Sequence, residues 1–177
     1  MKKKAKKSMA MNKHLEVIVE EDRWLDCLKN VADYSQKVFK KTLDYLSEIE
    51  LDFDKPIVVN LALSNDSDVK KLNFEFRGKD KPTNVLSFAN IDSEDFEASY
   101  VNDDVVELGD IVIALETTQA EAKEKGIEFR EHFAHLLVHG LLHLHGFDHQ
   151  DDDEAEEMEA IEVEILYDLN INNPYEE

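Results

Sequence analysis

Apolar residues recur with two different spacings along the chain, and these spacings predict an alternation of strands and helices. Polar and apolar residues alternate over residues 14–20, which is typical of a strand with one buried face. Residues 57–63 form a compact apolar run, which predicts a strand that is buried on both faces. Residues 85–89 and 108–115 predict two further strands.

Apolar residues at intervals of three and four predict five helices between and after these strands. The predicted helices are residues 24–49, 66–77, 118–126, 128–145 and 151–170. Asn65 or Asp66 caps the second helix and Gly78 ends it, while Thr118 and Glu121 form a capping box at the start of the third. An acidic loop with little periodicity is expected over residues 92–104.

The fourth predicted helix, residues 128–145, is apolar almost all round, so we expect it to be the buried central element. No internal repeat and no clear linker interrupts the pattern. We therefore predict a single domain over residues 14–172, preceded by a disordered, lysine-rich tail over residues 1–13.

The composition narrows the class of protein. A hydrophobic fraction of 42% in 177 residues fits a globular chain. No apolar run approaches the roughly 20 residues that cross a bilayer, so no membrane partner is expected. The only cysteine is Cys27, which excludes an internal disulfide and, together with the lack of a secretory signal, predicts a cytoplasmic protein.

The formal net charge of −21 argues against generic nucleic-acid binding, because phosphate contacts require Lys and Arg. The charge is unevenly distributed, however. Residues 151–177 carry twelve acidic side chains and no Lys or Arg, whereas basic residues gather in the tail and between Lys70 and Lys81. A chain with this distribution can still present one local basic cleft to RNA.

Three histidines near the end of the fourth helix have the spacing of a metal site. His139 and His143 are four residues apart and therefore point to the same side of a helix. Gly146 can end the helix, and His149 can return from the loop as a third ligand. Three imidazoles in an open tetrahedral site favour zinc over nickel, copper or iron.

These offsets are those of the metzincin zinc proteases, H-E-x-x-H-x-x-G-x-x-H, with one difference. Gly140 stands where that motif has its glutamate, so the general base of a protease is missing at the expected place. A glycine inside a helix costs about 1 kcal/mol relative to alanine. The position therefore needs the absence of a side chain, either for close packing against a strand or to leave room for a substrate.

The neighbouring polar residues have less certain roles on sequence alone. His135 lies one turn before His139, and could support a ligand or form part of the cleft wall. His132 and His145 are expected to be surface or structural residues. Asp148 could orient a ligand through a hydrogen bond or cap the turn.

Arg77 is the other candidate for a functional residue. It ends an otherwise apolar helix in a turn that also carries Lys79 and Lys81. A solvated arginine is the simpler interpretation, but a guanidinium also presents paired donors that match a phosphate. The two lysines could guide an RNA backbone into the same cleft.

The chain resembles a known family in the run that contains the three histidines. Residues 139–149 read HGLLHLHGFDH, which resembles the H-G-x-L-H-L-x-G-[aromatic]-D-H motif of the YbeY-type bacterial rRNA maturation factors, zinc-dependent single-strand endoribonucleases. Further segments similar to that family are NFEFRGKDKPTNVLSF at residues 73–88, LGDIVI at 108–113 and DDEAEEME at 152–159. Together they cover most of residues 57–170.

This resemblance implies an α+β fold, with a mixed four-stranded sheet packed with about five helices around a zincin-like central metal helix. It implies that His139, His143 and His149 bind one zinc ion and that Arg77 is the required arginine of the cleft. It also implies cleavage of single-stranded RNA, not DNA, in the 3′-end processing of 16S rRNA, in ribosome maturation and in quality control, with the small ribosomal subunit as partner.

Two other classes of function stay open at this point. A zinc metallopeptidase would need a carboxylate from elsewhere in the chain near the metal, such as Glu116 or Glu131. A non-catalytic assembly factor would bind ribosomal subunits even after the metal is removed.

Overall fold

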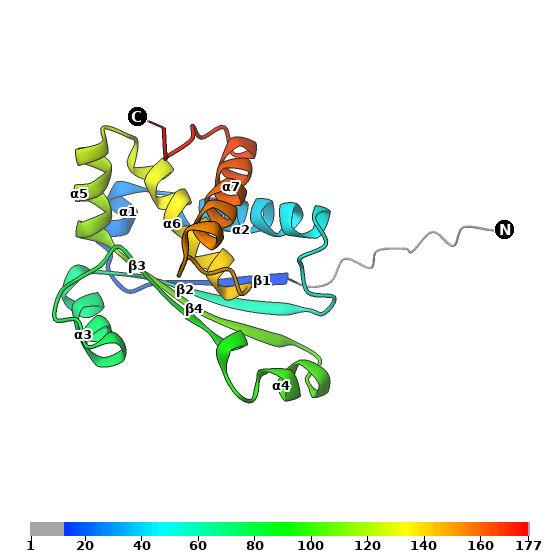
Figure 1. The fold of residues 1–177 in the computed structure, drawn as a ribbon. Coiled ribbons are helices and arrows are strands. Elements are labelled where there is room, and N and C mark those ends of the chain that lie inside the picture. Colours follow the sequence, from blue (N-terminus) through cyan, green and yellow to red (C-terminus); the bar gives the residue numbers. More distant parts are fainter. Residues whose placement is uncertain (1–12, 177) are drawn as a thin grey trace.

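The described residues, 13–176 of a computed structural model, contain a four-stranded sheet in the order β1–β2–β4–β3 (Figure 1). Strands β1 (Lys13–Val19), β2 (Ile57–Ser64) and β4 (Val106–Ala114) are parallel, and β3 (Val85–Ala89) pairs antiparallel with β4 at one edge. The mixed α+β architecture expected from the sequence is confirmed. Of the predicted tail, residues 1–12 lie outside the described residues, and Lys13 begins β1.

Seven α-helices and one short 3-10 helix lie in this part of the chain, where about five helices were expected. They are α1 (Arg23–Cys27), α2 (Val31–Glu48), α3 (Asp66–Arg77), η1 (Asn90–Asp92), α4 (Phe96–Asn102), α5 (Leu115–Lys125), α6 (Phe129–Leu144) and α7 (Asp152–Asp168). Figure 1 shows α1, α2, α5, α6 and α7 over one face of the sheet and α3 on the other side, while α4 lies beside the start of β4 and packs against the main core. None of the described helices is long and apolar enough to cross a membrane.

One of the two additional helices arises because the predicted helix over residues 24–49 is broken. Leu28 is extended, with φ −145° and ψ 88°, and α2 starts only at Val31. The short α1 is anchored by Trp24, which is fully buried and donates its indole N–H to the carbonyl of Ser64 at 2.9 Å. This contact with β2 fixes α1 separately from α2.

The other additional helix, α4, forms within the segment predicted as an acidic loop. Phe96 and Tyr100 lie one turn apart and pack against Phe53, with ring centroids 6.2 and 5.8 Å from the Phe53 ring. Lys55 donates hydrogen bonds to carbonyls at the end of the helix, including that of Asp103 at 3.1 Å. These partners come from a distant part of the chain, so the local periodicity did not reveal the helix.

The capping box predicted at the start of α5 is wrong. The helix begins at Leu115, directly after the end of β4 and three residues before Thr118, so Thr118 lies inside the helix. The Thr118 hydroxyl donates to the carbonyl of Ala114 at 2.6 Å, and Glu121 points elsewhere, to Asn84 and His132. Asn65, in contrast, caps α3 as predicted, because its side-chain oxygen accepts from the N–H of Asp68 at 3.0 Å.

The two faces of the sheet are covered unequally. In β2, the fully buried residues alternate with residues that are only partly buried. Those that face the large helical layer are Ile57, Val59, Leu61 and Leu63. The expectation that this strand is buried on both faces is therefore wrong, since α3 packs on the opposite face only through a small cluster around Val69, Leu86 and Val112.

Helix α6 is the central element, as expected from its apolar sequence. It packs against the sheet on one side and against α2, α5 and α7 on the others. A Cβ placed on Gly140 would lie 3.0 Å from two carbon atoms of the Ile111 side chain on β4. Gly140 is buried, so close packing against the strand explains this glycine and no room for a substrate exists at this position.

Candidate functional site

The structure brings together the three histidines that the sequence predicts as metal ligands. His139 and His143 lie on one side of α6, with their Nε2 atoms 3.0 Å apart. His149 comes from the loop before α7, and one ring nitrogen from each histidine lies within 4.8 Å of the others. Within residues 13–176, this is the group of side chains with the geometry to hold a metal ion.

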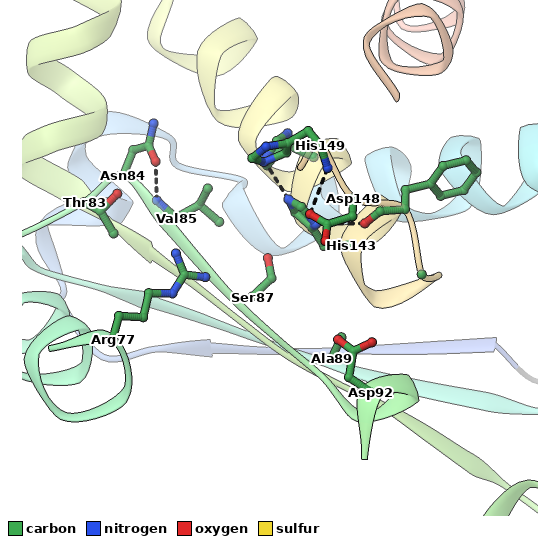
Figure 2. Close-up of a pocket in the computed structure, with 13 residues that line it drawn as sticks. Arg77, Thr83, Asn84, Val85, Ser87, Ala89, Asp92, His143, Asp148 and His149 are labelled. Atoms are coloured by element: carbon green, nitrogen blue, oxygen red, sulfur yellow. Dashed lines mark hydrogen bonds between the residues drawn. The ribbon is translucent and has the colours of Figure 1, made fainter. Parts of the chain in front are cut away.

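The end of α6 positions the third histidine. The helix ends at Leu144, and Gly146 follows with a φ of +92°, a conformation that favours glycine. The N–H of Phe147 then donates to the carbonyl of Leu142 at 3.1 Å, which turns the chain back along the helix. This reversal places His149 beside the two histidines of α6 (Figure 2).

Hydrogen bonds fix the orientation of both helical histidines. His139 donates its Nδ1–H to Glu162 Oε1 at 2.6 Å, and His143 donates its Nδ1–H to the Phe147 carbonyl at 2.9 Å. Both Nε2 lone pairs therefore point into the space that the three rings share. Ligand nitrogens around a tetrahedral zinc ion are about 3.3 Å apart, so this donor set fits a metal ion.

Burial keeps His143 in the form that binds metal. Desolvation lowers the pKa of His143 below its ordinary value, and the neighbouring His139 lowers it further, against a smaller opposing effect of the hydrogen bond to Phe147. A neutral imidazole is the form that can donate a lone pair to a cation.

Glu162 is the functional residue that the sequence analysis missed. This α7 carboxylate is fully buried and contacts His139 through one oxygen and His135 through the other, at 3.1 Å. Burial alone would raise its pKa, but the hydrogen bonds and charges of the two histidines outweigh burial and lower it to about 2. Its position between Ile161 and Ile165, on the inward stripe of α7, was the available signal, since a charge there needs a buried partner.

A cavity of about 460 Å³ opens beside the three histidines, which is within the usual range for ligand sites, roughly 300–1000 Å³. Its lining comes from the end of α3, from β3 and the residues around it, and from α6 and the following loop. The lining residues are Arg77, Thr83, Asn84, Val85, Ser87, Ala89, Asp92, His139, His143, Gly146, Phe147, Asp148 and His149. Arg77 and the three predicted ligands thus share one cavity.

In the view of Figure 2, Arg77 extends from the end of α3 toward the histidines, with Ser87 of β3 between them. Lys79 and Lys81 are exposed and do not line the cavity, so their predicted role as guides stays a prediction. The polar residues of β3 and the turn before it were not singled out from the sequence. Asn84 is held there by Glu121, which accepts its amide N–H at 3.0 Å.

The remaining histidines and Asp148 support the structure around the cavity. His132 and His145 are both buried, bonded to Glu121 and to the Leu141 carbonyl, so they are structural and not surface residues. Asp148 caps the turn, since its carboxylate accepts from the N–H of His149 at 2.8 Å. His135 contacts Glu162 and does not line the cavity.

Comparison with known proteins gives a consistent result. The family model described as endoribonuclease YbeY matches residues 7–170. Proteins named endoribonuclease YbeY include one from Agrobacterium fabrum, 42% identical over 91% of this chain and 94% of its own length. Another, from Paramagnetospirillum magneticum, is 49% identical over 70% of this chain and 74% of its own length. The family resemblance inferred from the motifs is confirmed.

The fold is also found among solved structures. A solution structure of a protein from Thermotoga maritima matches with a TM-score of 0.51 and 22% sequence identity, covering 93% of this chain and 97% of the other. At this identity the similarity supports the fold alone.

Proposed function

This chain belongs to the endoribonuclease YbeY family, and on that premise we propose that it cleaves single-stranded RNA with a zinc ion held by His139, His143 and His149. The observation that carries the proposal is the shared cavity. The three histidines and Arg77 line the same space, although they come from opposite sides of β3 (Figure 2).

Zinc is the ion that best suits the donor set. Three imidazoles leave an open fourth position, as in catalytic zinc sites, and harder ions such as Mg²⁺ prefer oxygen ligands. A zinc ion bound there would polarise a phosphoryl oxygen and lower the pKa of water. Glu162 and the Phe147 carbonyl hold His139 and His143 in the tautomer that this binding requires.

Arg77 is the proposed catalytic residue of the chain. A guanidinium donates two parallel hydrogen bonds to phosphate oxygens, and it stabilises the negative charge that develops when a phosphodiester is attacked. The neutral, polar lining contributed by Thr83, Asn84 and Ser87 can accommodate a sugar–phosphate backbone. The cavity is lined by one arginine in a chain of net charge −21, which favours a specific cleft over general RNA binding.

In the cell, the proposed substrate is the 3′ end of 16S rRNA on the small ribosomal subunit, in the cytoplasm. The family name supports RNA as the substrate. The small ribosomal subunit is proposed as the partner because of the motif resemblance. It should therefore be tested as a substrate alongside a simple oligonucleotide.

The metallopeptidase alternative needs a carboxylate near the metal, and the two candidates named from the sequence are elsewhere. Neither Glu116 nor Glu131 lines the cavity. Glu116 instead accepts hydrogen bonds from Arg23 at 2.6 Å and from the N–H of Asp66 at 2.8 Å. The carboxylates that do line the cavity are Asp92 and Asp148, so the family match is what favours RNA cleavage.

The test combines metal analysis with cleavage of an end-labelled single-stranded RNA. We expect one zinc per chain and cleavage that a chelator abolishes and added zinc restores, with no cleavage of the same sequence as DNA. Arg77→Ala should retain zinc and lose roughly 100- to 1000-fold in kcat/KM, because one transition-state donor is removed. His143→Ala should lose the zinc itself.

Arg130→Ala is the matched control, since this guanidinium lies over the Tyr34 ring, 4.6 Å from its centroid, and not in the cavity. If Arg77→Ala loses zinc as well, Arg77 is structural and its assigned role is wrong. Zinc binding without cleavage, together with sedimentation on small subunits that survives chelation, would instead identify a non-catalytic assembly factor.

A further inference from the structure

The C-terminal segment ends in a contact with the buried support of the histidine group. Tyr175 lies beyond residues 7–170, the span that matches the family model. Its hydroxyl donates a hydrogen bond to Glu162 Oε2 and lies 3.1 Å from His135 Nε2. The Tyr175 ring also meets His135 edge to face, with centroids 5.4 Å apart and an interplanar angle of 85°.

The segment that carries Tyr175 is itself anchored. Its chain turns at Asn170, which has a φ of +60°, and Ile171 then packs into the main core. The N–H of Tyr175 donates to Asn173 Oδ1 at 2.9 Å. The tyrosine is therefore placed by local structure and not only by its hydroxyl contact.

Glu162 connects this segment to a predicted metal ligand. Its two oxygens face opposite ways: Oε1 accepts from His139, and Oε2 accepts from His135 and Tyr175. Hydrogen bonds on Oε2 fix the rotation of the carboxylate, and so fix where Oε1 meets His139 Nδ1. The tyrosine hydroxyl also compensates a carboxylate that is fully removed from water.

We propose that Tyr175 is a positioning residue for the metal centre, acting through Glu162 to hold His139 with Nε2 toward the ion. Docking of residues 171–176 and metal binding are then energetically coupled. The inference rests on the metal site of the proposed function, but not on RNA cleavage. Because coupling is reciprocal, a bound metal must favour the docked segment by the same factor by which the docked segment favours the metal.

The first test measures metal affinity in the full chain. Tyr175→Phe removes the hydroxyl and keeps the ring that contacts His135. We expect zinc affinity, measured by competition with a chromophoric chelator, to fall about tenfold, the lower end of the loss for residues that support a ligand. Tyr167→Phe is the matched control on α7, because that side chain is 76% exposed, and its zinc affinity should be unchanged.

The second test measures a consequence that simple packing would not produce. In the metal-free chain, the Nδ1 proton of His139 should give a protected NMR resonance that broadens or disappears in Tyr175→Phe and persists in Tyr167→Phe. Adding zinc should slow amide hydrogen exchange of residues 171–176 in the unsubstituted chain, and should slow it much less in Tyr175→Phe.

The outcomes separate this inference from the proposed function. A chain that binds no zinc at all refutes the metal site, and the coupling with it. A chain that binds zinc equally well with and without the Tyr175 hydroxyl, with exchange of residues 171–176 unaffected by zinc, refutes the coupling alone.

Discussion

His132 shows how a single buried side chain makes stability depend on pH. Desolvation lowers the pKa of His132 below its ordinary value of 6.5, although its 2.6 Å contact with Glu121 acts in the opposite direction. As pH falls, the unfolded chain therefore takes up a proton before the folded chain does. The contribution of neutral His132 to stability is complete above pH 6.5 and is lost as pH falls below that value.

We predict that His132→Gln reduces the loss of stability on acidification. The measurement is urea unfolding between about pH 7.5 and about pH 5.5, in the presence of a chelator so that metal binding does not contribute. His14→Gln, at an exposed position on β1, is the control and should keep the original slope. Equal slopes for all three chains would show that His132 keeps the same pKa in both states.

At the scale of elements, the packing of α6 against β4 determines where the two helical histidines lie. Gly140→Ala would introduce a methyl group 3.0 Å from the Ile111 side chain in a fully packed region. Overpacking costs about 1–3 kcal/mol, and the gain in helix propensity is about 1 kcal/mol. We expect a net loss of about 1 kcal/mol in the free energy of unfolding.

The control for this substitution is the same change in an Ile111→Ala background. Alanine lacks all three Ile111 atoms that lie 3.0 to 3.2 Å from the added methyl group, so Gly140→Ala should there be neutral or stabilising. Chemical denaturation of the unsubstituted chain, the two single variants and the double variant gives the coupling free energy between positions 140 and 111. A loss of equal size in both backgrounds would place the cost of the methyl group elsewhere than at Ile111.

The elements that the sequence predicted well are those with a strong local signal. The four strands and helices α3, α6 and α7 follow from periodicity and from end residues such as Asn65 and Gly146. The break before α2, the existence of α4 and the start of α5 depend on contacts made across the fold, through Trp24, Phe53 and Asn84. Local patterns contain no information on such partners.

In the candidate site, too, the sequence predicted the residues that have a local signal and missed those that the tertiary fold brings in. The three histidines were predicted because their spacing on a helix and turn is a local property, and Arg77 because of its motif. Glu162 and Tyr175 were missed, since each acquires its role only when α7 and the C-terminal segment fold back onto α6. The shared cavity likewise forms only when α3, β3 and α6 come together in the folded protein, because each of them contributes lining residues.

At the scale of the whole molecule, charge should affect folding and RNA binding in opposite ways. The chain has 41 acidic and 20 basic residues, so self-repulsion destabilises the folded state and salt should relieve it. We predict that raising NaCl from about 50 to about 500 mM raises the Tm while weakening RNA binding. Since one arginine lines the cavity, the salt dependence should correspond to about one to three phosphate contacts.

Thermal unfolding and RNA binding measured across the same salt series would check both expectations. A Tm that falls with salt would mean that attractive ion pairs outweigh the excess of negative charge. A steep salt dependence of binding would mean that Lys79 and Lys81, outside the cavity, also contact the RNA backbone.

The order of the site residues along the chain bears on when the protein can act. The complete sheet and Arg77 lie before residue 115, whereas His149, Glu162 and Tyr175 come from the last 29 residues of the sequence. Proteins are synthesised from the N-terminus, so a partly made chain can form its sheet before it has a full set of metal ligands. On the proposed ligand assignment, the nuclease would then be inactive while a ribosome is still translating it, and a chain terminated before His149 would lack one metal ligand and cut no RNA.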